Sequence, residues 1–341
     1  MTLPVKPRVV ALGEPKFVGA DYLAEFRKTF DYSFLPVSNR AETQQLLPTD
    51  IAANGPIDAF IIRMGTPPFE PFDEGLLGAL VPNCKIIVSA SAGYNEFDLQ
   101  WMNKEGILFC NTLDAVAEAT ADMALFLILA VLRNTWNAEK SLRNGIWRLS
   151  GCDNLVPTRD PSGLTLGIVG MGAIGKYIAK KAASFNMRII YHNRNQLPEG
   201  EETKYNATYY KSLHGLLAQS DVVSISCPLN AQTTGLIGEA EFAVMKDGVF
   251  LVNTARGAIV DEKALISALE SGKVTRAGLD VFANEPSPNP WFFQSDQVIL
   301  QPHMGDLTDI AYQKAERECF ENIRAFFTTG KANSPVNIRQ A

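Results

Sequence analysis

The sequence has few of the residues that would mark a secreted, metal-binding or nucleic-acid-binding protein. Its 341 residues include five scattered cysteines, with no CxxC pair, and only three histidines. An odd number of separated cysteines is typical of reduced thiols in a cytoplasmic protein, and no metal site is expected. The net charge of −6 is spread along the chain, whereas nucleic acids and anionic membranes bind a concentrated basic face. We therefore expect a cytoplasmic protein whose partner is a small molecule.

Long hydrophobic runs are also missing. The longest apolar run, residues 123–132, is far shorter than the roughly 20 residues that cross a bilayer, so it predicts a buried helix. The first residues, MTLPVKPRVVALG, lack the basic, apolar and small-residue zones of a signal peptide. With 46% apolar and 20% charged residues, the composition is that of an ordinary folded protein without membrane association.

Short apolar segments alternate with amphipathic ones in two series, which predicts two α/β domains. Helices are expected at residues 20–29, 73–80, 96–104, 116–143 and 307–327. Strands are expected in the first series at residues 8–12, 57–63, 85–90 and 107–110, and in the second at 164–169, 187–192, 221–227, 249–252, 275–281 and 297–301. Such alternation predicts doubly wound parallel sheets, and the length fits two domains.

A glycine-rich motif begins the second series. Gly170, Gly172 and Gly175 form a G-x-G-x-x-G between an expected strand and an expected helix. In this context the first glycine allows a tight turn, the second lets the backbone approach a pyrophosphate, and the third lets helix and strand pack closely. The helix N-terminus offers free N–H groups to the phosphates. The alternative is a glycine-rich turn without a ligand.

The residues that follow the next expected strand bear on the choice of dinucleotide. Where NAD-binding proteins carry an Asp or Glu for the ribose 2′-hydroxyl, this chain has Asn193, followed by Arg194. Without that carboxylate a 2′-phosphate is not repelled, and a guanidinium can pair with it. We therefore expect NADP(H) to be preferred over NAD(H). Alternatively, Arg194 is a solvated loop residue and NAD binds through the backbone.

Reactive side chains follow three expected strands of the second series. Arg256, Glu285 and His303 lie just after strands, and ligands of parallel sheets bind beyond the carboxyl ends of the strands. Reduction of a 2-oxo acid fits this set. A histidine can protonate the carbonyl oxygen, a carboxylate can raise its pKa and orient it, and an arginine can bind the substrate's negative charge. Of the other histidines, His192 is expected to be a pocket-wall or surface residue and His214 an ordinary helix histidine.

The chain resembles the D-isomer-specific 2-hydroxyacid dehydrogenases over nearly its whole length, and most closely their fungal glyoxylate/hydroxypyruvate reductase branch. The resemblance rests on the glycine motif and on several ordered segments. They are Ser91-Ala-Gly93-Tyr94, Ala119-Thr120-Ala121-Asp122, Tyr191-His-Asn-Arg194, Cys227-Pro-Leu-Asn, Val252-Asn-Thr-Ala-Arg256-Gly, Gly278-Leu-Asp280, Glu285-Pro and Pro302-His303-Met-Gly.

The resemblance implies roles that spacing alone does not. The catalytic set of the family falls on Arg256, Glu285 and His303. Ser91, Ala92 and Gly93 match the family's substrate-binding segment, in which backbone N–H groups matching Ala92 and Gly93 bind the substrate carboxylate. Asp280 matches a residue near the nicotinamide carboxamide. The full set of implied cofactor-binding residues is Thr120, Gly170, Gly172, Ala173, Ile174, Gly175, Asn193, Arg194, Asn195, Cys227, Pro228, Thr233, Thr254, Ala255, Asp280 and Gly305.

The resemblance also implies a domain arrangement and a homodimer. A flavodoxin-like substrate-binding domain at residues 1–112 and 307–341 would be interrupted by a Rossmann NAD(P)-binding domain at 113–306. Trp147 resembles a tryptophan that, in some glyoxylate reductases, reaches the partner's active site, or else it packs in the dimer. Some positions depart from the commonest pattern, among them Asp306 and Leu307, where small or hydroxyl residues are frequent.

The expected activity is NADPH-dependent reduction of glyoxylate or hydroxypyruvate to D-2-hydroxy acids. Two alternatives remain open. One is a reductase of bulkier 2-oxo acids. Met64, Phe69 and Phe72 would line the pocket for either class of substrate, unless they are core or rim residues. The other is a dinucleotide-sensing corepressor or adaptor built on the same scaffold.

Overall fold

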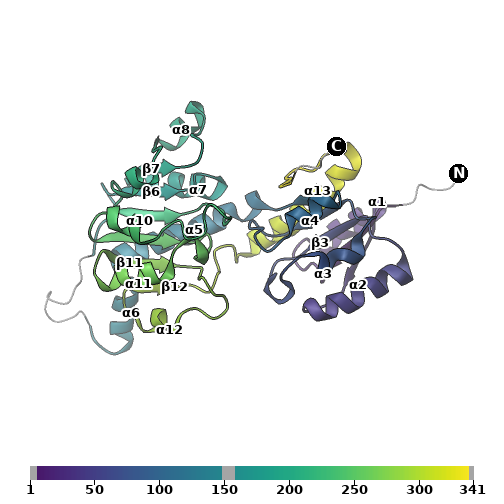
Figure 1. Ribbon diagram of the computed structural model, residues 1–341, viewed down its shortest axis with the longest axis horizontal. Helices are drawn as coiled ribbons and strands as arrows, with labels where there is room; N and C mark the ends of the chain where they lie inside the picture. The colour runs from purple at the N-terminus through teal and green to yellow at the C-terminus, as the bar shows by residue number, and fades with distance from the viewer. Residues whose placement is uncertain (1–5, 148–157, 338–341) are drawn as a thin grey trace. The chain divides into compact units, whose positions relative to one another are not determined.

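The computed structural model describes residues 6–147 and 158–337, which form two compact α/β units (Figure 1). Unit 1 comprises Met1–Val116 and Leu307–Ala341, and unit 2 comprises Ala117–Asp306. Within the described residues, unit 1 contains a five-stranded sheet and unit 2 a seven-stranded sheet, and every strand pairing is parallel. The predicted fold class, two parallel-sheet α/β domains, is confirmed.

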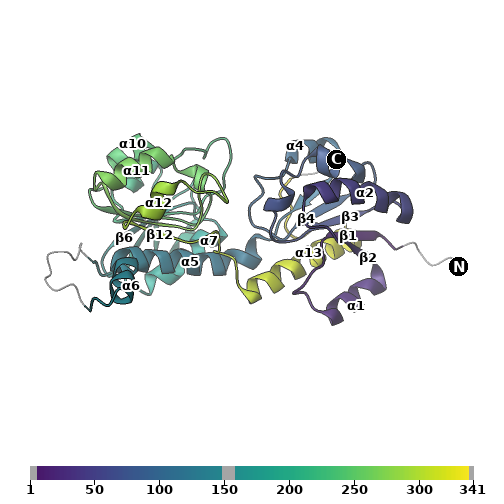
Figure 2. The same cartoon turned by 90° about the horizontal axis from the view of Figure 1, so that it is seen from below.

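The sheet of unit 1 has the strand order β2-β1-β3-β4-β5, and its helices cover both faces. Figure 2 shows α2 and α4 on one face and α1 and α13 on the other. The strands are β1 (Arg8–Leu12), β2 (Asp31–Leu35), β3 (Ala59–Ile62), β4 (Ile86–Ser89) and β5 (Leu108–Cys110). The helices are α1 (Ala20–Thr29), α2 (Arg40–Asn54), α3 (Glu74–Leu77), α4 (Leu99–Lys104) and α13 (Asp309–Thr329), with 3-10 turns η1 (Pro67–Phe69) and η2 (Gly78–Leu80).

The sheet of unit 2 has the order β12-β11-β10-β9-β6-β7-β8. Helices α5 and α7 lie on one face, and α10, α11 and α12 on the other (Figure 2). The strands are β6 (Thr165–Val169), β7 (Arg188–His192), β8 (Ala207–Tyr209), β9 (Val222–Ile225), β10 (Val249–Asn253), β11 (Val274–Leu279) and β12 (Val298–Leu300). The helices are α5 (Leu113–Arg133), α6 (Thr135–Arg143), α7 (Ala173–Ala183), α8 (Glu199–Tyr205), α9 (Leu213–Leu217), α10 (Glu239–Val244), α11 (Glu262–Glu270) and α12 (Pro290–Gln294), with η4 (Gly257–Ile259).

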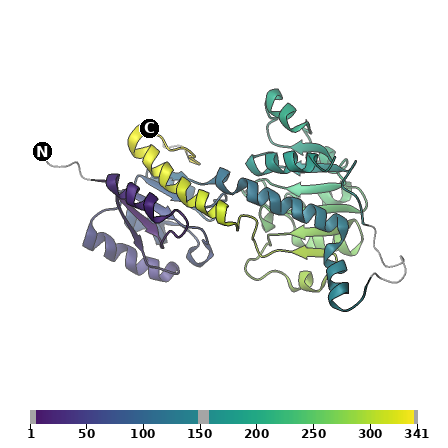
Figure 3. The same cartoon turned by 180° about the vertical axis from the view of Figure 1, so that it is seen from behind.

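The expected helix at residues 116–143 is two helices, so that prediction is corrected. Asn134 adopts a left-handed φ of 53°, which ends α5 at Arg133 and lets α6 begin at Thr135. Helix α5 runs along one face of the unit 2 sheet (Figure 3). It is long and apolar enough to span a membrane by length and composition, but most of its apolar stretch is buried inside the protein. It is therefore the core helix of unit 2.

The unit boundary falls inside α5, between Val116 and Ala117, rather than at the expected residues 112 and 113. A single helix connects the two units there, so the change of unit coincides with no loop that the sequence could reveal. The return to unit 1 occurs between Asp306 and Leu307, just before α13. Figure 3 shows α13 beside the sheet of unit 1, so the end of the chain completes the unit that its beginning starts.

Candidate active site

The glycine motif forms the turn between β6 and α7 at the carboxyl edge of the unit 2 sheet. Gly170 has a φ of 103°, and a Cβ there would lie 2.5 Å from the Cys227 nitrogen. A Cβ on Gly175 would lie 2.3 Å from the Gly170 oxygen. A Cβ on Gly172, by contrast, would have no neighbour within 4 Å among the described residues. Two glycines therefore permit close packing, while Gly172 leaves space beside the N-terminus of α7 for a ligand.

Two buried hydroxyl groups at the same edge lack partners. Ser226 follows β9 and Thr254 follows β10, and neither Oγ atom has a hydrogen-bond partner in the described part of the chain. A buried hydroxyl without a partner lowers the stability of the folded protein unless a ligand or water forms a hydrogen bond with it. A bound dinucleotide would fit this edge. It would meet these hydroxyls, the open turn at Gly172, and the free N–H groups of Ala173 and Ile174 in the first turn of α7. The residues present are thus suited to NAD(P)(H).

The segment after β7 holds the glycine turn in place. The Oδ1 atom of Asn193 accepts the Met171 N–H at 2.7 Å, and the Asn193 carbonyl accepts the Tyr209 hydroxyl at 3.1 Å. Arg194 and Asn195 follow it and are exposed. Asn193 therefore stabilises the glycine turn, besides any contact with the cofactor. Arg194 is accessible to a 2′-phosphate.

The remaining predicted cofactor-binding residues lie at the carboxyl edge as well. Burial raises the pKa of the Cys227 thiol to about 11, so it is a neutral thiol. The Thr233 hydroxyl donates to the Pro228 carbonyl at 2.6 Å and accepts the Asn230 N–H at 2.8 Å, which closes the segment after β9. Ala255 lies in the turn after β10. Both Thr233 bonds stay within its own segment, and its contact with cofactor stays a prediction.

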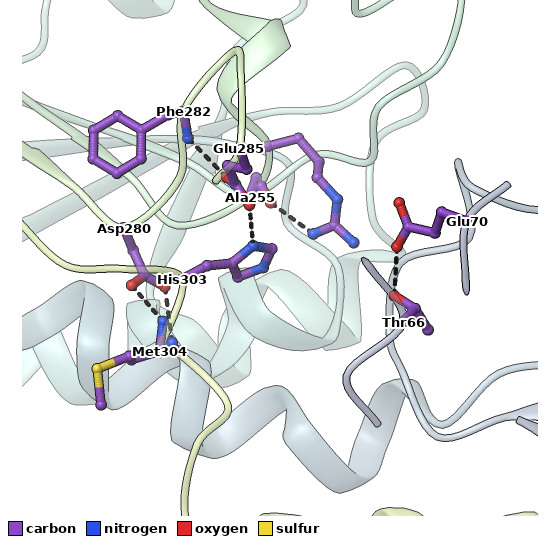
Figure 4. Close-up of polar contacts among 10 residues, drawn as sticks. Thr66, Glu70, Ala255, Asp280, Phe282, Glu285, His303 and Met304 are labelled. Carbon is purple, nitrogen blue, oxygen red and sulfur yellow. Dashed lines mark hydrogen bonds and ion pairs between the residues drawn. The ribbon is translucent and has the colours of Figure 1, made fainter. Parts of the chain in front are cut away.

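His303 and Glu285 form a direct pair at this edge (Figure 4). The His303 Nδ1 atom lies 2.7 Å from Oε2 of Glu285, and the other carboxylate oxygen of Glu285 accepts the Phe282 N–H at 2.8 Å. Glu285 is therefore fixed by the backbone, and it fixes the imidazole ring in turn. Because Nδ1 faces Glu285, the Nε2 atom is the one left to act on a substrate.

The surroundings of His303 favour its protonated form. The hydrogen bond that His303 donates to Glu285 raises the pKa of His303, and this outweighs burial and the positive charge of Arg256, which lower it. Burial alone would raise the pKa of Glu285, but the hydrogen bonds from His303 and from the Phe282 N–H bring it below its ordinary value. Burial also raises the pKa of Asp306, against the nearby charges of His303 and Arg256. The raised pKa of His303 and the lowered pKa of Glu285 both favour an imidazolium beside a carboxylate.

Asp280, which follows β11, shapes the loop that carries His303. Its carboxylate accepts the N–H groups of Met304 at 2.7 Å and Gly305 at 2.8 Å, and its carbonyl accepts the His303 N–H at 2.8 Å (Figure 4). His303 itself has a left-handed φ of 55°. A Cβ on Gly305 would lie 2.9 Å from Oδ2 of Asp280 and 3.3 Å from Cγ2 of Thr120. Three predicted cofactor-binding residues, Asp280, Gly305 and Thr120, therefore lie together.

Arg256 projects from the turn after β10, and a neighbouring asparagine shapes that turn. The Asn253 amide accepts the Ala255 N–H at 3.0 Å and donates to the Arg256 carbonyl at 2.9 Å. The Arg256 Nη1 atom donates to the Ala255 carbonyl at 2.9 Å. Sequence reasoning gave Asn253 no role. The signal that could have found it is a buried amide at a strand end, three residues before an arginine with a predicted catalytic role.

The other two histidines have structural partners. The Nδ1 atom of His192 lies 2.8 Å from the Tyr210 carbonyl, and Nε2 of His214 lies 2.9 Å from Glu241. Neither contacts the His303–Glu285 pair. In the described residues no group of three or more His, Cys, Asp or Glu side chains could hold a metal ion.

The predicted substrate-carboxylate segment belongs to unit 1, whereas the predicted catalytic residues belong to unit 2. Ser91, Ala92 and Gly93 follow β4. The Ser91 hydroxyl bonds within the segment, at 3.0 Å from the Gly93 carbonyl, and the Ala92 carbonyl accepts the Asn111 amide at 2.7 Å. These bonds use the carbonyl groups. The N–H groups of Ala92 and Gly93 have no partner in the described part of the protein, which suits them to an anion.

Comparisons with known proteins agree with this geometry. Residues 125–305 match the family model described as D-isomer specific 2-hydroxyacid dehydrogenase, NAD binding domain. The chain is 58% identical over 332 residues to "Dehydrogenase efuE" of Hormonema carpetanum, covering 97% of this chain and 82% of that protein.

Two solved structures are similar over nearly the whole chain. One is a glyoxylate reductase from Paecilomyes thermophila, with a TM-score of 0.88 and 37% identity over 98% of this chain and 99% of that one. The other is the holo form of Rhodotorula graminis D-mandelate dehydrogenase, with a TM-score of 0.89 and 32% identity over 98% and 99%.

Proposed function

The chain belongs to the D-isomer-specific 2-hydroxyacid dehydrogenases, enzymes of the glyoxylate reductase type, and we propose that it reduces glyoxylate or hydroxypyruvate with NADPH. The observation that carries this proposal is the 2.7 Å contact between His303 and Glu285 at the edge where the glycine turn opens. An imidazolium held by a carboxylate is a general acid that can act at neutral pH.

In the proposed reaction the residues of the chain bind the substrate and supply one proton. When bound, the reduced nicotinamide supplies a hydride to the carbonyl carbon. His303 gives its Nε2 proton to the carbonyl oxygen, and Glu285 stabilises the imidazolium before the transfer. Arg256 attracts the substrate's carboxylate and offsets the negative charge that develops on the carbonyl oxygen. The products are the 2-hydroxy acid, which has the D configuration where C2 is a stereocentre, the oxidised nicotinamide and a neutral His303.

The preference for NADPH rests on the segment after β7. Asn193 replaces the carboxylate that would repel a 2′-phosphate, and it is held by Met171, while the exposed Arg194 offers a planar cation to that phosphate. We expect Arg194→Gln to raise the KM for NADPH at least tenfold and to leave that for NADH unchanged. Arg188→Gln is the matched control, because Arg188 is also exposed but begins β7, whereas Arg194 follows the end of that strand.

The experiment that tests the activity is a rate panel. The oxidation of NADPH and of NADH is followed at 340 nm with glyoxylate, hydroxypyruvate, pyruvate and phenylglyoxylate. Turnover of glyoxylate and hydroxypyruvate with NADPH supports the proposal. Turnover of phenylglyoxylate alone would replace it by a reductase of bulky 2-oxo acids, which the likeness to a D-mandelate dehydrogenase favours. No turnover of any 2-oxo acid would leave a binding protein.

We also propose a homodimer in the cytoplasm. Large apolar side chains are exposed on and after α6, where Leu142 is 56% and Trp147 is 75% exposed. Large apolar side chains exposed close together in the sequence are typical of an interface with another chain. Light scattering after size exclusion measures the assembly, and Leu142→Ser with Trp147→Ser should shift it to the monomer. The cysteines at positions 84, 110, 227 and 319 are free thiols, in keeping with a reducing compartment.

A further inference from the structure

Arg63 is a cation at the carboxyl edge of the unit 1 sheet. It follows β3, whose last residue, Ile62, lies between Leu12 of β1 and Ser89 of β4. The Ala90 N–H donates to the Ile62 carbonyl at 2.9 Å. Arg63 and the segment that begins at Ser91 therefore leave the same edge from neighbouring strands.

The Nε atom of Arg63 is shielded from water and lacks a partner, although the residue as a whole is partly exposed. That atom is buried and has no hydrogen-bond partner within residues 6–147 and 158–337. A charged donor that is shielded from water without a partner costs free energy, which a ligand with acceptor oxygens would recover. Arg8 and Arg40 of the same unit, by contrast, each have a carboxylate at 2.6 Å.

The surroundings orient Arg63 without consuming its donors. Its Cζ atom lies 5.8 Å from the centroid of the buried Phe69 ring. A Cβ on Gly13, just after β1, would come within 2.8 Å of the Arg63 Cδ atom, so the glycine makes room for the arginine. Glu70 is the one acidic residue between Arg63 and Phe72, and its carboxylate accepts the Thr66 hydroxyl at 2.6 Å instead (Figure 4).

We propose that Arg63 is a specificity residue that binds an oxygen substituent on C3 of the 2-oxo acid, the hydroxyl of hydroxypyruvate being the smallest case. The inference rests on the proposed function, in which the N–H groups of Ala92 and Gly93 receive the C1 carboxylate. The Arg63 side chain leans from β3 over Gly13, toward β1, whereas that segment follows β4 on the other side of β3. Arg63 is therefore placed for the other end of the substrate.

Glyoxylate makes the test sharp, because it has a carboxylate and a carbonyl group but no C3. For Arg63→Met we expect kcat/KM for hydroxypyruvate to fall about tenfold to a hundredfold, as for loss of a hydrogen bond from a charged donor. The kcat/KM for glyoxylate should stay within about twofold, and Arg63→Lys should restore part of the loss. Arg27→Met is the matched control: Arg27 also lies over an aromatic ring of this unit, with its Cζ 5.1 Å from the Tyr32 centroid, but it is exposed.

Each outcome decides the matter. A selective loss with hydroxypyruvate supports the proposal. An equal loss with both substrates, at unchanged NADPH affinity, would assign Arg63 to the shared carboxylate and overturn it. No change with either substrate would also overturn it, because Arg63 would then not contact the substrate. If the wild-type protein turns over neither substrate, the proposed function itself fails, which is a different result from any of these.

Discussion

His303 holds its imidazole Nδ1 atom 2.7 Å from Oε2 of Glu285 while its own backbone is left-handed, with a φ of 55°. A non-glycine residue in that region carries a conformational cost. Three hydrogen bonds to Asp280, from the N–H groups of residues 303, 304 and 305, hold the backbone there. The side chain is thus fixed by Glu285 and the main chain by Asp280, which leaves Nε2 in one place.

Replacing Glu285 with Gln should move the pH dependence of the reaction. The hydrogen bond with Glu285 raises the pKa of His303, so the protonated acid persists to higher pH than in free histidine. Reduction is therefore fast below this raised pKa and slows as the pH rises through it. In Glu285→Gln the pKa of His303 falls, so the loss of kcat begins at lower pH. At a pH above the pKa of His303 in both proteins, only the small protonated fraction reacts. The rate of the variant is therefore about tenfold lower for each unit by which its pKa has fallen.

Steady-state rates of glyoxylate reduction across pH 5–10 measure this change. Glutamine keeps the acceptor for the Phe282 N–H, so the backbone at 282–285 should not move. An unchanged profile would mean that Glu285 does not set the protonation of the acid.

Asp280→Asn should weaken both stability and catalysis. The carboxylate satisfies two backbone N–H groups, and Asp280 is 1% exposed. An asparagine has one acceptor oxygen, so one buried N–H is left without a partner, at about 1–3 kcal/mol in the free energy of unfolding. The His303 loop then loosens, and a displacement of its side chain costs about a hundredfold in kcat. Denaturant unfolding and kcat are the measurements.

The control for this variant is Asp247→Asn. The Asp247 carboxylate is 93% exposed and pairs with Lys273 at 2.8 Å, and exposed ion pairs contribute little. Equal stability of the two variants would contradict the role given to Asp280.

The buried strands can be predicted from the sequence, including the edge strands β5 and β12, whereas the exposed edge strands β2 and β8 cannot. Every residue of β1, β6 and β10 is buried, and a central strand of a covered parallel sheet is a continuous apolar run. The edge strand β2 escapes prediction, because three of its five residues are exposed and no run results. The edge strand β8 escapes it likewise. Helix α2 also escapes prediction, because Pro48 and several polar residues interrupt its pattern of apolar residues.

The candidate catalytic residues can be found in the sequence because Arg256, Glu285 and His303 each follow a strand, but the residues that hold them in place cannot. Glu285 and His303 are 18 residues apart, and their contact depends on how β11 and β12 pair. The Asp280 bonds depend on the backbone of the His303 loop, and the Asn253 bonds on the turn after β10. Phe69 and Phe72, for which the sequence allows a place in the pocket or in the core, are fully buried in the unit 1 core. Aromatic residues have the same apolar character in both settings, so sequence does not separate them.

The three glycines of the turn should respond differently to the same substitution. A Cβ on Gly172 meets no atom within 4 Å of the described residues, so Gly172→Ala should fold with an unchanged Tm and bind NADPH at least tenfold more weakly, because the methyl group occupies the place of the pyrophosphate. A Cβ on Gly175 would lie 2.3 Å from the Gly170 carbonyl oxygen. Gly175→Ala should therefore lose about 1–3 kcal/mol of stability before any ligand is added.

Thermal unfolding without cofactor and fluorescence titration with NADPH separate these two effects. If Gly172→Ala binds NADPH as tightly as the wild-type protein, the pyrophosphate does not sit on this turn.

His303→Ala should lose about 10²- to 10⁴-fold in kcat, the contribution of a general acid, and keep its affinity for NADPH. Alanine is, however, poorly suited to a φ of 55°, so a slow Ala variant could reflect a moved loop. His303→Asn resolves this, because asparagine tolerates the left-handed region and has no proton to give at neutral pH. Both variants should be equally slow in glyoxylate reduction, while His214→Ala, which removes the exposed pair with Glu241, should keep the wild-type rate. A near wild-type rate in His303→Asn would remove His303 from the mechanism.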